Sequence, residues 1–452
     1  MPALCLAAGI ATGRPLSLPW LLAVLAVLLA ATWLTARRPR VQTVGIWLCF
    51  GGLGMVVAPG DDAQADDGMW TEAVVASAPA DRPKTVMAVL LLPATGEQRH
   101  CYFTKPWTAP AIGSSLLVRI RDGHFIGHDD WQPGGDGFNR LSRWQRLRLR
   151  ALKWRQHIAE RLTSDGTDGA ADRDALAVLV AMTLGDKSAL TKELRDVYAV
   201  SGASHILALS GLHLGIIYMF LTFLTLGRRR RWLVQVLLVL AVWAFALLTG
   251  LSTSIVRAAI MITVYSLFAL GGRRHASLGV LSFTALVMLL ADSRSLFDVG
   301  FQLSFMSMVG ILLFVPLMEG LTPVRWIMAH PVTHWLFGLL AVSLAAQLGT
   351  APLVAYYFGR FPLWFLLTNL VVVPLATLIL FGTLFTLAVP ALAGALLWLV
   401  GIMNTALAGL AALPLASIEG LHPSLLQVAM MYVVVAVAYA MAVMAWGNRR
   451  WC

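Results

Sequence analysis

The chain has 452 residues, of which 58% are hydrophobic and 13% are charged, and its mean hydropathy is +0.75. A soluble domain carries roughly 25% charged residues, so this composition excludes a soluble globular protein and indicates a polytopic membrane protein. The net charge of +11 reflects 34 basic and 23 acidic residues. In a membrane protein such an excess marks cytoplasmic loops, so by itself it does not indicate nucleic-acid binding.

Residues 1–59 are predicted to be membrane anchor spans. The apolar runs 19–34 and 41–58 are long enough to cross a bilayer, whereas 3–11 is too short and reads as a half-helix. The segment lacks the basic start and cleavage site of a signal peptide, so we expect it to be retained. Arg-rich residues 37–40 are expected in the cytoplasm, and the Asp-rich residues 61–67 outside.

Residues 60–140 are the predicted extracytoplasmic domain. Runs rich in Val, Leu, Thr and aromatic residues, separated by Gly and Pro, predict strands at 72–77, 85–92, 99–103 and 115–120. A domain of this size with four or five strands fits a small OB-like β-barrel. A β-sandwich or an irregular extracytoplasmic loop are the alternatives.

Residues 141–172 are predicted to form a basic amphipathic interfacial helix and a linker. Residues 140–162 contain eight basic residues and one acid, and Leu141, Trp144, Leu147 and Trp154 recur at helical spacing. Such a helix favours anionic lipid headgroups. The alternative is a surface that binds single-stranded DNA. Its candidate nucleic-acid-binding residues are Arg143, Trp144, Arg148, Arg150, Trp154 and Arg155.

Residues 173–452 are predicted to be a transmembrane channel domain. Its candidate spans are apolar runs at 206–226, 232–248, 255–270, 278–290, 300–317, 335–353, 363–387, 391–413 and 425–446. If each run crosses once, the Arg clusters at 228–231, 273–274 and 449–450 fall on one side, and Asp292, Asp298 and Arg360 on the other. The fold class is therefore a polytopic α-helical membrane protein of about eleven spans with an inserted OB-like domain.

Polar residues inside these apolar runs are the candidate functional residues, because buried ionisable groups are costly in a bilayer. His205 and His213 are spaced to share a helix face, either as interhelical hydrogen-bonding groups or as pore-lining ones. Arg257 either snorkels to the interface or presents a cation to a water-filled path. Asp298 is placed to cap a helix and to pair with Arg257.

Four ordered motifs lie at 184–187 with 201–215, at 250–259, at 298–305, and at 346–352 with 357–360 and 369–374. Together they resemble the motifs of the ComEC competence family, the inner-membrane channel for DNA uptake. With the intramembrane polarity, the resemblance implies a translocation path formed by Ser210, Gly211, His213, Gly215, Ser254, Arg257, Asp298, Gln302, Gln347 and Asn369. Close helix packing is expected at Ser210, Gly211 and Gly215.

The resemblance implies passage of single-stranded DNA across the cytoplasmic (inner) membrane in natural transformation. The implied partners are this DNA, membrane lipid, an extracytoplasmic DNA receptor and a cytoplasmic helicase; it also allows a separate nuclease and a homodimer. Many family members carry a metallo-β-lactamase-like domain, but this sequence contains no HxHxDH cluster, CxxC pair or P-loop. We therefore expect no enzymatic activity and no cofactor. The alternatives are a transporter for another anionic substrate and a non-transporting scaffold.

Overall fold

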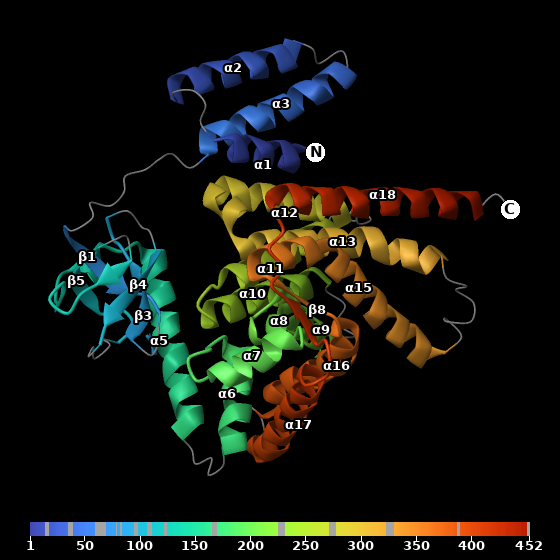
Figure 1. Ribbon diagram of the computed structural model, residues 1–452. Coiled ribbons are helices and arrows are strands. Elements are labelled where there is room, and N and C mark those ends of the chain that lie inside the picture. Colours follow the sequence, from blue (N-terminus) through green and yellow to red (C-terminus); the bar gives the residue numbers. More distant parts are fainter. Residues whose placement is uncertain are drawn as a thin grey trace.

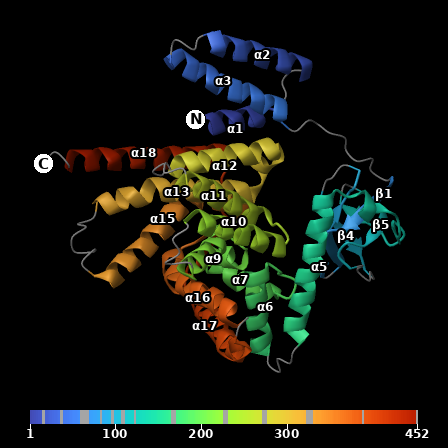
Figure 2. The same cartoon turned by 180° about the vertical axis from the view of Figure 1, so that it is seen from behind.

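The computed structural model describes residues 1–13, 18–34, 39–58, 69–77, 79–81, 84–94, 98–105, 111–121, 124–164, 170–224, 231–270, 277–321, 330–386 and 389–449. Three parts follow one another along the chain: an N-terminal helical layer, a β region beside the long helix α5 (Arg143–Ser164), and a large helical block (Figure 1). Seen from behind, α5 stands between the strands and the helical block (Figure 2).

The N-terminal layer consists of α1 (Pro2–Thr12), α2 (Leu18–Leu34) and α3 (Pro39–Val57), so the apolar runs predicted there are helices. Leu6 and Ile10 of α1 are fully buried in an apolar cluster with Leu289 and Phe301 of the helical block. The short first helix therefore attaches this layer to the rest of the protein. Residues 37–38 of the Arg-rich segment 37–40 and all of the Asp-rich residues 61–67 lie outside the described residues.

The β region contains the four predicted strands and three shorter ones. Its strands are β1 (Trp70–Val75), β2 (Ala80–Asp81), β3 (Thr85–Leu91), β4 (Gln98–Thr104), β5 (Ser115–Arg119), β6 (Phe125–Ile126) and β7 (Trp131–Pro133). The strand order is β6-β4-β3-β1-β5-β7, with β2 beside β3. Pairing is antiparallel except between β4 and β6. Because β5 returns to lie beside β1, the order β5-β1-β3-β4 is that of a Greek key.

Alternating residues of these strands form the core of the β region. In β3, for example, Val86, Ala88 and Leu90 are buried, while the residues between them are half-buried. Phe103 of β4 and Leu116 of β5 meet them in the same cluster. This alternation is the reason that strands could be predicted from the sequence.

Cys101 of β4 lies inside this core, and we expect its thiol to be unreactive in the native protein. Its side chain has no exposed surface, and burial raises its pKa to about 12, against the opposing charge of Arg99. Since the thiolate is the nucleophile, iodoacetamide should modify Cys101 only after unfolding. Peptide mass spectrometry with and without denaturant measures this, and rapid labelling of native protein would contradict it.

Helix α5 packs on the protein through Leu149 and Leu152, and Trp144 and Trp154 of the predicted interfacial face stay exposed. The predicted apolar face includes Trp144 and Trp154, which are 55% and 61% exposed, whereas Leu149 and Leu152 are buried. The buried side is therefore turned away from the Trp residues, because the hydrophobic clusters on the β region and on α6 (Ala170–Leu184) use Leu149, Leu152 and Ala159. Leu147 is also exposed, so Trp144, Leu147 and Trp154 form an exposed apolar stripe.

The helical block contains the described helices from α6 onward and a two-stranded sheet, whereas the short helix α4 (Gly137–Arg140) lies against β1 and β5 of the β region. The α-helices are α6, α7 (Lys192–Val200), α8 (Ser204–Leu207), α9 (Gly211–Leu224), α10 (Arg231–Leu248), α11 (Thr253–Leu270), α12 (Ser277–Ala291), α13 (Val299–Leu321), α15 (Pro331–Phe358), α16 (Phe365–Thr386), α17 (Ala393–Ala411) and α18 (Leu425–Arg449). The strands β8 (Arg360–Pro362) and β9 (Ser417–Glu419) pair antiparallel and join the start of α16 to the segment before α18. Helices α6 and α7 were not predicted.

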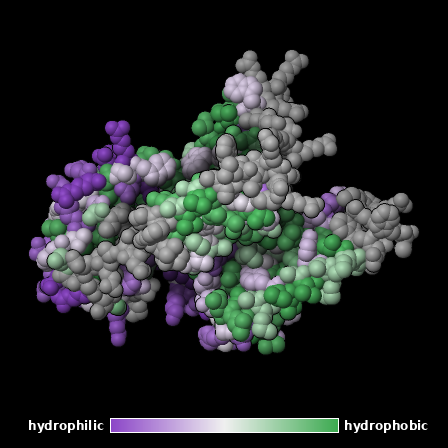
Figure 3. Space-filling model, turned by 90° about the horizontal axis from the view of Figure 1, so that it is seen from above, coloured by the Kyte–Doolittle hydropathy of each residue, from purple (hydrophilic) through white to green (hydrophobic). Residues whose placement is uncertain are grey.

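Five described helices are long and apolar enough to cross a membrane: α13, α15, α16, α17 and α18. Shorter apolar helices occupy most of the other predicted spans, including α10, α11 and α12. The count of about eleven spans thus stays a prediction. Most Arg residues of the clusters at 228–231, 273–274 and 449–450 lie outside the described residues. Viewed from above, hydrophilic residues gather over the β region and hydrophobic ones over the helices (Figure 3).

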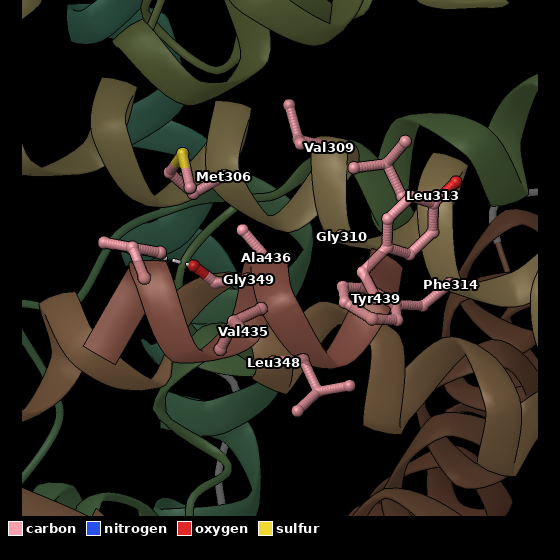
Figure 4. A pocket seen from close by; sticks show the side chains of 11 residues that line it. Met306, Val309, Gly310, Leu313, Phe314, Leu348, Gly349, Val435, Ala436 and Tyr439 are labelled. Atoms are coloured by element: carbon pink, nitrogen blue, oxygen red, sulfur yellow. Dashed lines mark hydrogen bonds between the residues drawn. The ribbon is translucent and has the colours of Figure 1, made fainter. Parts of the chain in front are cut away.

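Helices α13 and α15 approach each other through glycine. A Cβ on Gly310 would overlap the backbone carbonyl oxygen of Ala345, and one on Gly349 would overlap that of Met306. Helix α18 crosses this pair, and the Tyr432 hydroxyl donates to the Gly349 carbonyl at 2.9 Å. An apolar cavity of about 220 Å³ lies at the crossing (Figure 4). None of the predicted path residues lines it.

Candidate functional site

The first motif contains a break between two helices. Helix α8 ends at Leu207 and α9 begins at Gly211, so the predicted span over 206–226 is not continuous. His205 and His213 consequently lie on different helices, and the shared face predicted for them is wrong. His205 instead lies 3.1 Å from the Gly202 carbonyl through its Nδ1.

His213 is completely buried just after this break. Its Nδ1 accepts the backbone N–H of Ser210 at 3.3 Å and lies 2.9 Å from the Ser210 hydroxyl. Since Nδ1 is the acceptor, the neutral ring carries its proton on Nε2. That Nε2 is buried and has no hydrogen-bond partner among the described residues. The motif thus presents an unused N–H donor inside the helical block.

The glycines of this motif differ in their surroundings. A Cβ on Gly211 would make an ordinary 3.6 Å contact with the Ala258 Cβ, which brings the first motif against the second. Around Gly215 no described atom lies within 4 Å of such a Cβ. The described residues therefore do not provide the close packing expected at Gly215.

Arg257 of α11 is the buried cation of the second motif, with only 3% of its surface exposed. Its Nη1 lies 4.0 Å from Oδ1 of Asp298, so the two predicted partners do approach. The same Oδ1 accepts the backbone N–H of Phe301 at 2.8 Å and thereby caps α13. Nε of Arg257 is buried without a hydrogen-bond partner in the described part of the chain.

The guanidinium of Arg257 lies at the N-terminus of α13. A Cβ on Gly300 would come within 3.4 Å of Nη2 of Arg257. A helix N-terminus carries a partial positive charge, so Arg257 adds a cation to an already positive helix end. Asp298, whose side chain is 43% exposed, only partly offsets this charge. The junction of α11 and α13 therefore favours an anion.

Gln302 and Tyr357 join the third motif to the fourth. The Tyr357 hydroxyl donates to Oε1 of Gln302 at 2.8 Å, and Nε2 of Gln302 donates to the Leu296 carbonyl at 3.0 Å. Both ends of the Gln302 amide are therefore used in holding α13 to α15 and to the turn before α13. This arrangement supports a positioning role for Gln302.

The segment between the second and third parts of the fourth motif contacts the first motif. Gly202 has a φ of +83° and packs against Pro362. A side chain at position 202 would clash there, because its Cβ would lie only 2.9 Å from the Cβ of Pro362. The four sequence motifs are spread over nearly 200 residues, and each contacts the next through Gly211–Ala258, Arg257–Asp298 and Gln302–Tyr357.

Three predicted path residues have less defined surroundings. Ser254 is half-buried on the first turn of α11, and Gln347 is half-buried within α15. Asn369 of α16 has a buried Oδ1 with no hydrogen-bond partner among the residues described. The same holds for the Ser252 hydroxyl in the turn before α11, a candidate that the sequence did not single out. Its position between Gly250 and Arg257 was the available signal.

The candidate nucleic-acid residues of α5 divide into two groups. Arg143, Trp144, Arg150 and Trp154 are exposed. Arg148 and Arg155 instead donate to the backbone carbonyls of Gly250 and Thr249, at 3.0 and 3.2 Å. Only the exposed group is free to contact a strand or a headgroup.

Comparison with known proteins identifies the family. A family model described as "Competence protein" matches residues 182–445, more than half of the chain. The chain belongs to the competence protein family. With this membership and its five long apolar helices, it is a multi-pass membrane protein. The competence match contains all four motifs, whereas α5 and the β region precede it.

Relatives of this competence protein include ComE operon protein 3 of Bacillus subtilis, which is 30% identical over 252 residues, or 55% of this chain and 30% of that protein. An uncharacterized protein of Aquifex aeolicus is 31% identical over 238 residues, or 52% of this chain and 54% of that one. The uncharacterized protein YcaI of Escherichia coli is 25% identical over 215 residues, or 45% of this chain and 28% of that protein. The matches thus cover about half of the Aquifex relative and less than a third of the others. No solved structure matches.

No group of three His, Cys, Asp or Glu side chains among the described residues is placed to hold a metal ion.

Proposed function

We propose that this protein forms a path for single-stranded DNA through the cytoplasmic (inner) membrane during natural transformation. Membership of the competence family supports a role in DNA uptake. The path is assigned to the four contacting motifs, and Arg257 is its cation for backbone phosphates. In this proposal the chain transports DNA and does not hydrolyse it.

The observation that carries the proposal is the buried, incompletely partnered Arg257. Its Nε, Nε2 of His213 and Oγ of Ser252 are three buried polar atoms without partners among the described residues. All three belong to α9, α11 or the turn before α11, which share one apolar cluster. Buried polar groups are normally paired, so unpaired donors indicate a ligand or water. Phosphate oxygens are suitable acceptors for each of these N–H groups.

We also infer an OB-like fold and an extracytoplasmic position for the β region. Its Greek-key strand order fits an OB-fold, which is a partly open Greek-key barrel. The exposed stripe of Trp144, Leu147 and Trp154, with exposed Arg143 and Arg150 beside it, fits a helix on anionic headgroups. The alternative occupant of this surface is the incoming strand.

The remaining parts of the proposal follow the family resemblance. An extracytoplasmic receptor would deliver DNA, and a cytoplasmic helicase would drive its passage. A separate nuclease chain and a homodimer fit the same scheme. The proposed topology has about eleven spans, with the shorter apolar helices supplementing the five long ones.

A deletion strain complemented with wild type, Arg257→Gln or Arg257→Lys tests the function. We expect the deletion to abolish transformation and Arg257→Gln to reduce it about tenfold or more at normal protein level, since a charge-assisted contact is lost. Arg257→Lys should retain part of the activity because it keeps the cation. Arg173→Gln, an exposed site on α6, is the matched control.

Other outcomes distinguish the alternatives. If the deletion strain imports labelled DNA into the cytoplasm normally, the protein is not the DNA path. If proteoliposomes carry small anions and exclude DNA, the chain is an anion transporter. If Arg257→Gln lowers protein level and transformation together, the Arg257–Asp298 pair is structural and the scaffold alternative gains support.

A further inference from the structure

Helix α5 binds the turn that connects α10 to α11 through hydrogen bonds and close packing. Arg148 Nε donates to the Gly250 carbonyl at 3.0 Å, and Arg155 Nη1 donates to the Thr249 carbonyl at 3.2 Å. Between them, Leu152 covers Gly250 so closely that a Cβ there would overlap its side chain. Three side chains, one helical turn apart, therefore hold two consecutive residues of the turn.

The end of α10 leaves these two carbonyls available. Leu251 donates its N–H to Ala246 at 2.8 Å and Gly250 donates to Leu247 at 3.0 Å, the pattern of a Schellman motif with Gly250 at φ +79°. The motif uses the carbonyls inside the last turn, so those of Thr249 and Gly250 need outside donors. Cations are favoured at a helix C-terminus, where the partial charge is negative.

Both arginines are partly desolvated at this position, which disfavours their charged form. Burial lowers the pKa of Arg148, with the charge of Arg155 adding to the effect. Burial also lowers the pKa of Arg155, while the nearby Asp186 opposes it. A guanidinium nevertheless stays protonated in proteins, and a buried charge needs hydrogen-bond partners. The turn carbonyls supply one partner to Nε of Arg148 and one to Nη1 of Arg155, while Nε of Arg155 has none among the described residues.

The α10–α11 turn leads directly into α11, the helix that carries Arg257. Leu251 has a φ of +54°, a strained conformation for a residue other than glycine, which persists only where neighbours enforce it. Helix α11 begins two residues later at Thr253, and Arg257 follows one turn further on. The orientation of α11 is thus set at a turn whose shape α5 enforces.

The same helix is attached to the β region. Leu149 and Leu152 share a buried cluster with Val74, Leu91 and Ile112 of the β region. Leu152 therefore contacts the β region's apolar cluster and Gly250 at once. No flexible linker separates these contacts, since all lie on one continuous helix.

We propose that Arg148 and Arg155 are positioning residues that set the place of Arg257 through the α10–α11 turn. Because α5 is one continuous helix, a displacement of the β region would be transmitted through it to α11, the helix that carries Arg257. This inference rests on the proposed function for its transport consequence. Its mechanical part can be tested without DNA.

Hydrogen exchange tests the mechanical part. In Arg148→Gln/Arg155→Gln, amides of residues 249–258 should exchange about tenfold faster or more, because two partly buried charge-assisted bonds are lost. Exchange in the rest of the protein should be unchanged. Arg195→Gln is the matched control, because Arg195 also donates to a backbone carbonyl, that of Lys187, but at an exposed site. Unchanged exchange at 249–258 overturns the proposal.

Should the double variant exchange rapidly throughout, the single variants Arg148→Gln and Arg155→Gln decide by the same criterion.

DNA uptake tests the link to Arg257 by a double-mutant cycle on the Arg257→Lys background. If the arginines act through Arg257, their substitution lowers DNA uptake by a smaller factor in the Arg257→Lys background than in wild type. If it lowers uptake by the same factor in both backgrounds, the link is refuted. If deletion of the gene leaves uptake normal, the proposed function fails, yet the exchange result still stands.

Discussion

Replacing Gly349 with leucine is expected to force α13 and α15 apart and to destabilise the helical block by about 3 kcal/mol. The new side chain would begin inside the space of the Met306 carbonyl oxygen, a backbone atom that cannot rotate away. Gly310 meets the Ala345 carbonyl in the same way, so the helices cannot relax by sliding locally. Small residues are needed wherever membrane helices approach this closely.

Gly338→Leu is the matched control for this prediction. Gly338 lies on the same helix α15, yet no described atom is within 4 Å of its potential Cβ. Thermal unfolding in detergent, followed by size-exclusion chromatography, should show a midpoint lowered by roughly 5 °C or more for Gly349→Leu and little change for Gly338→Leu. Equal midpoints for the two variants would mean that the glycine contact is unimportant.

Asp298→Ala is expected to have the second largest effect, because it removes two interactions together. The side chain caps α13 through Phe301, and loss of such a cap costs about 1 kcal/mol. It also leaves the buried Arg257 without its carboxylate neighbour. Since 43% of the Asp298 side chain is exposed, we expect this second part to be well below the roughly 3–5 kcal/mol cost of breaking a fully buried pair.

Asp298→Asn separates the two contributions. Asparagine caps helices about as well as aspartate, so this variant loses the charge and keeps the cap. We therefore expect unfolding midpoints in the order wild type, Asp298→Asn, Asp298→Ala. In Arg257→Gln/Asp298→Asn the unpaired cation is gone, and the midpoint should recover above that of Asp298→Asn. Failure to recover would show that the pair contributes nothing to stability.

Local regularities explain which elements could be predicted. The strands at 85–92 and 99–103 follow from alternating burial, and the long spans follow from uninterrupted apolar runs. The N-cap at Asp298 and its approach to Arg257 were also predictable, because both residues flank apolar runs on one predicted side of the membrane. These features depend on neighbouring residues or on the bilayer alone.

A helix with more than one apolar face is harder to place from the sequence. In α5, the Trp-bearing side has the stronger sequence pattern, yet Leu149 and Leu152 are the residues that pack. Periodicity identifies an apolar face but does not say whether protein or another surface covers it. Likewise, the eight-residue spacing of His205 and His213 assumed a continuous helix, which the break at 208–210 removes.

The sequence by itself determined the class of this protein, because apolar runs of bilayer length allow few other structures. It also indicated which polar residues are exceptional, since each is costly in such surroundings. Apart from the Arg257–Asp298 pair, only the tertiary structure decided what those residues touch. Arg148 and Arg155 find their carbonyl partners 102 and 94 residues away, and no local pattern encodes such a pairing. Arg257 meets Asp298 because α11 packs against the start of α13.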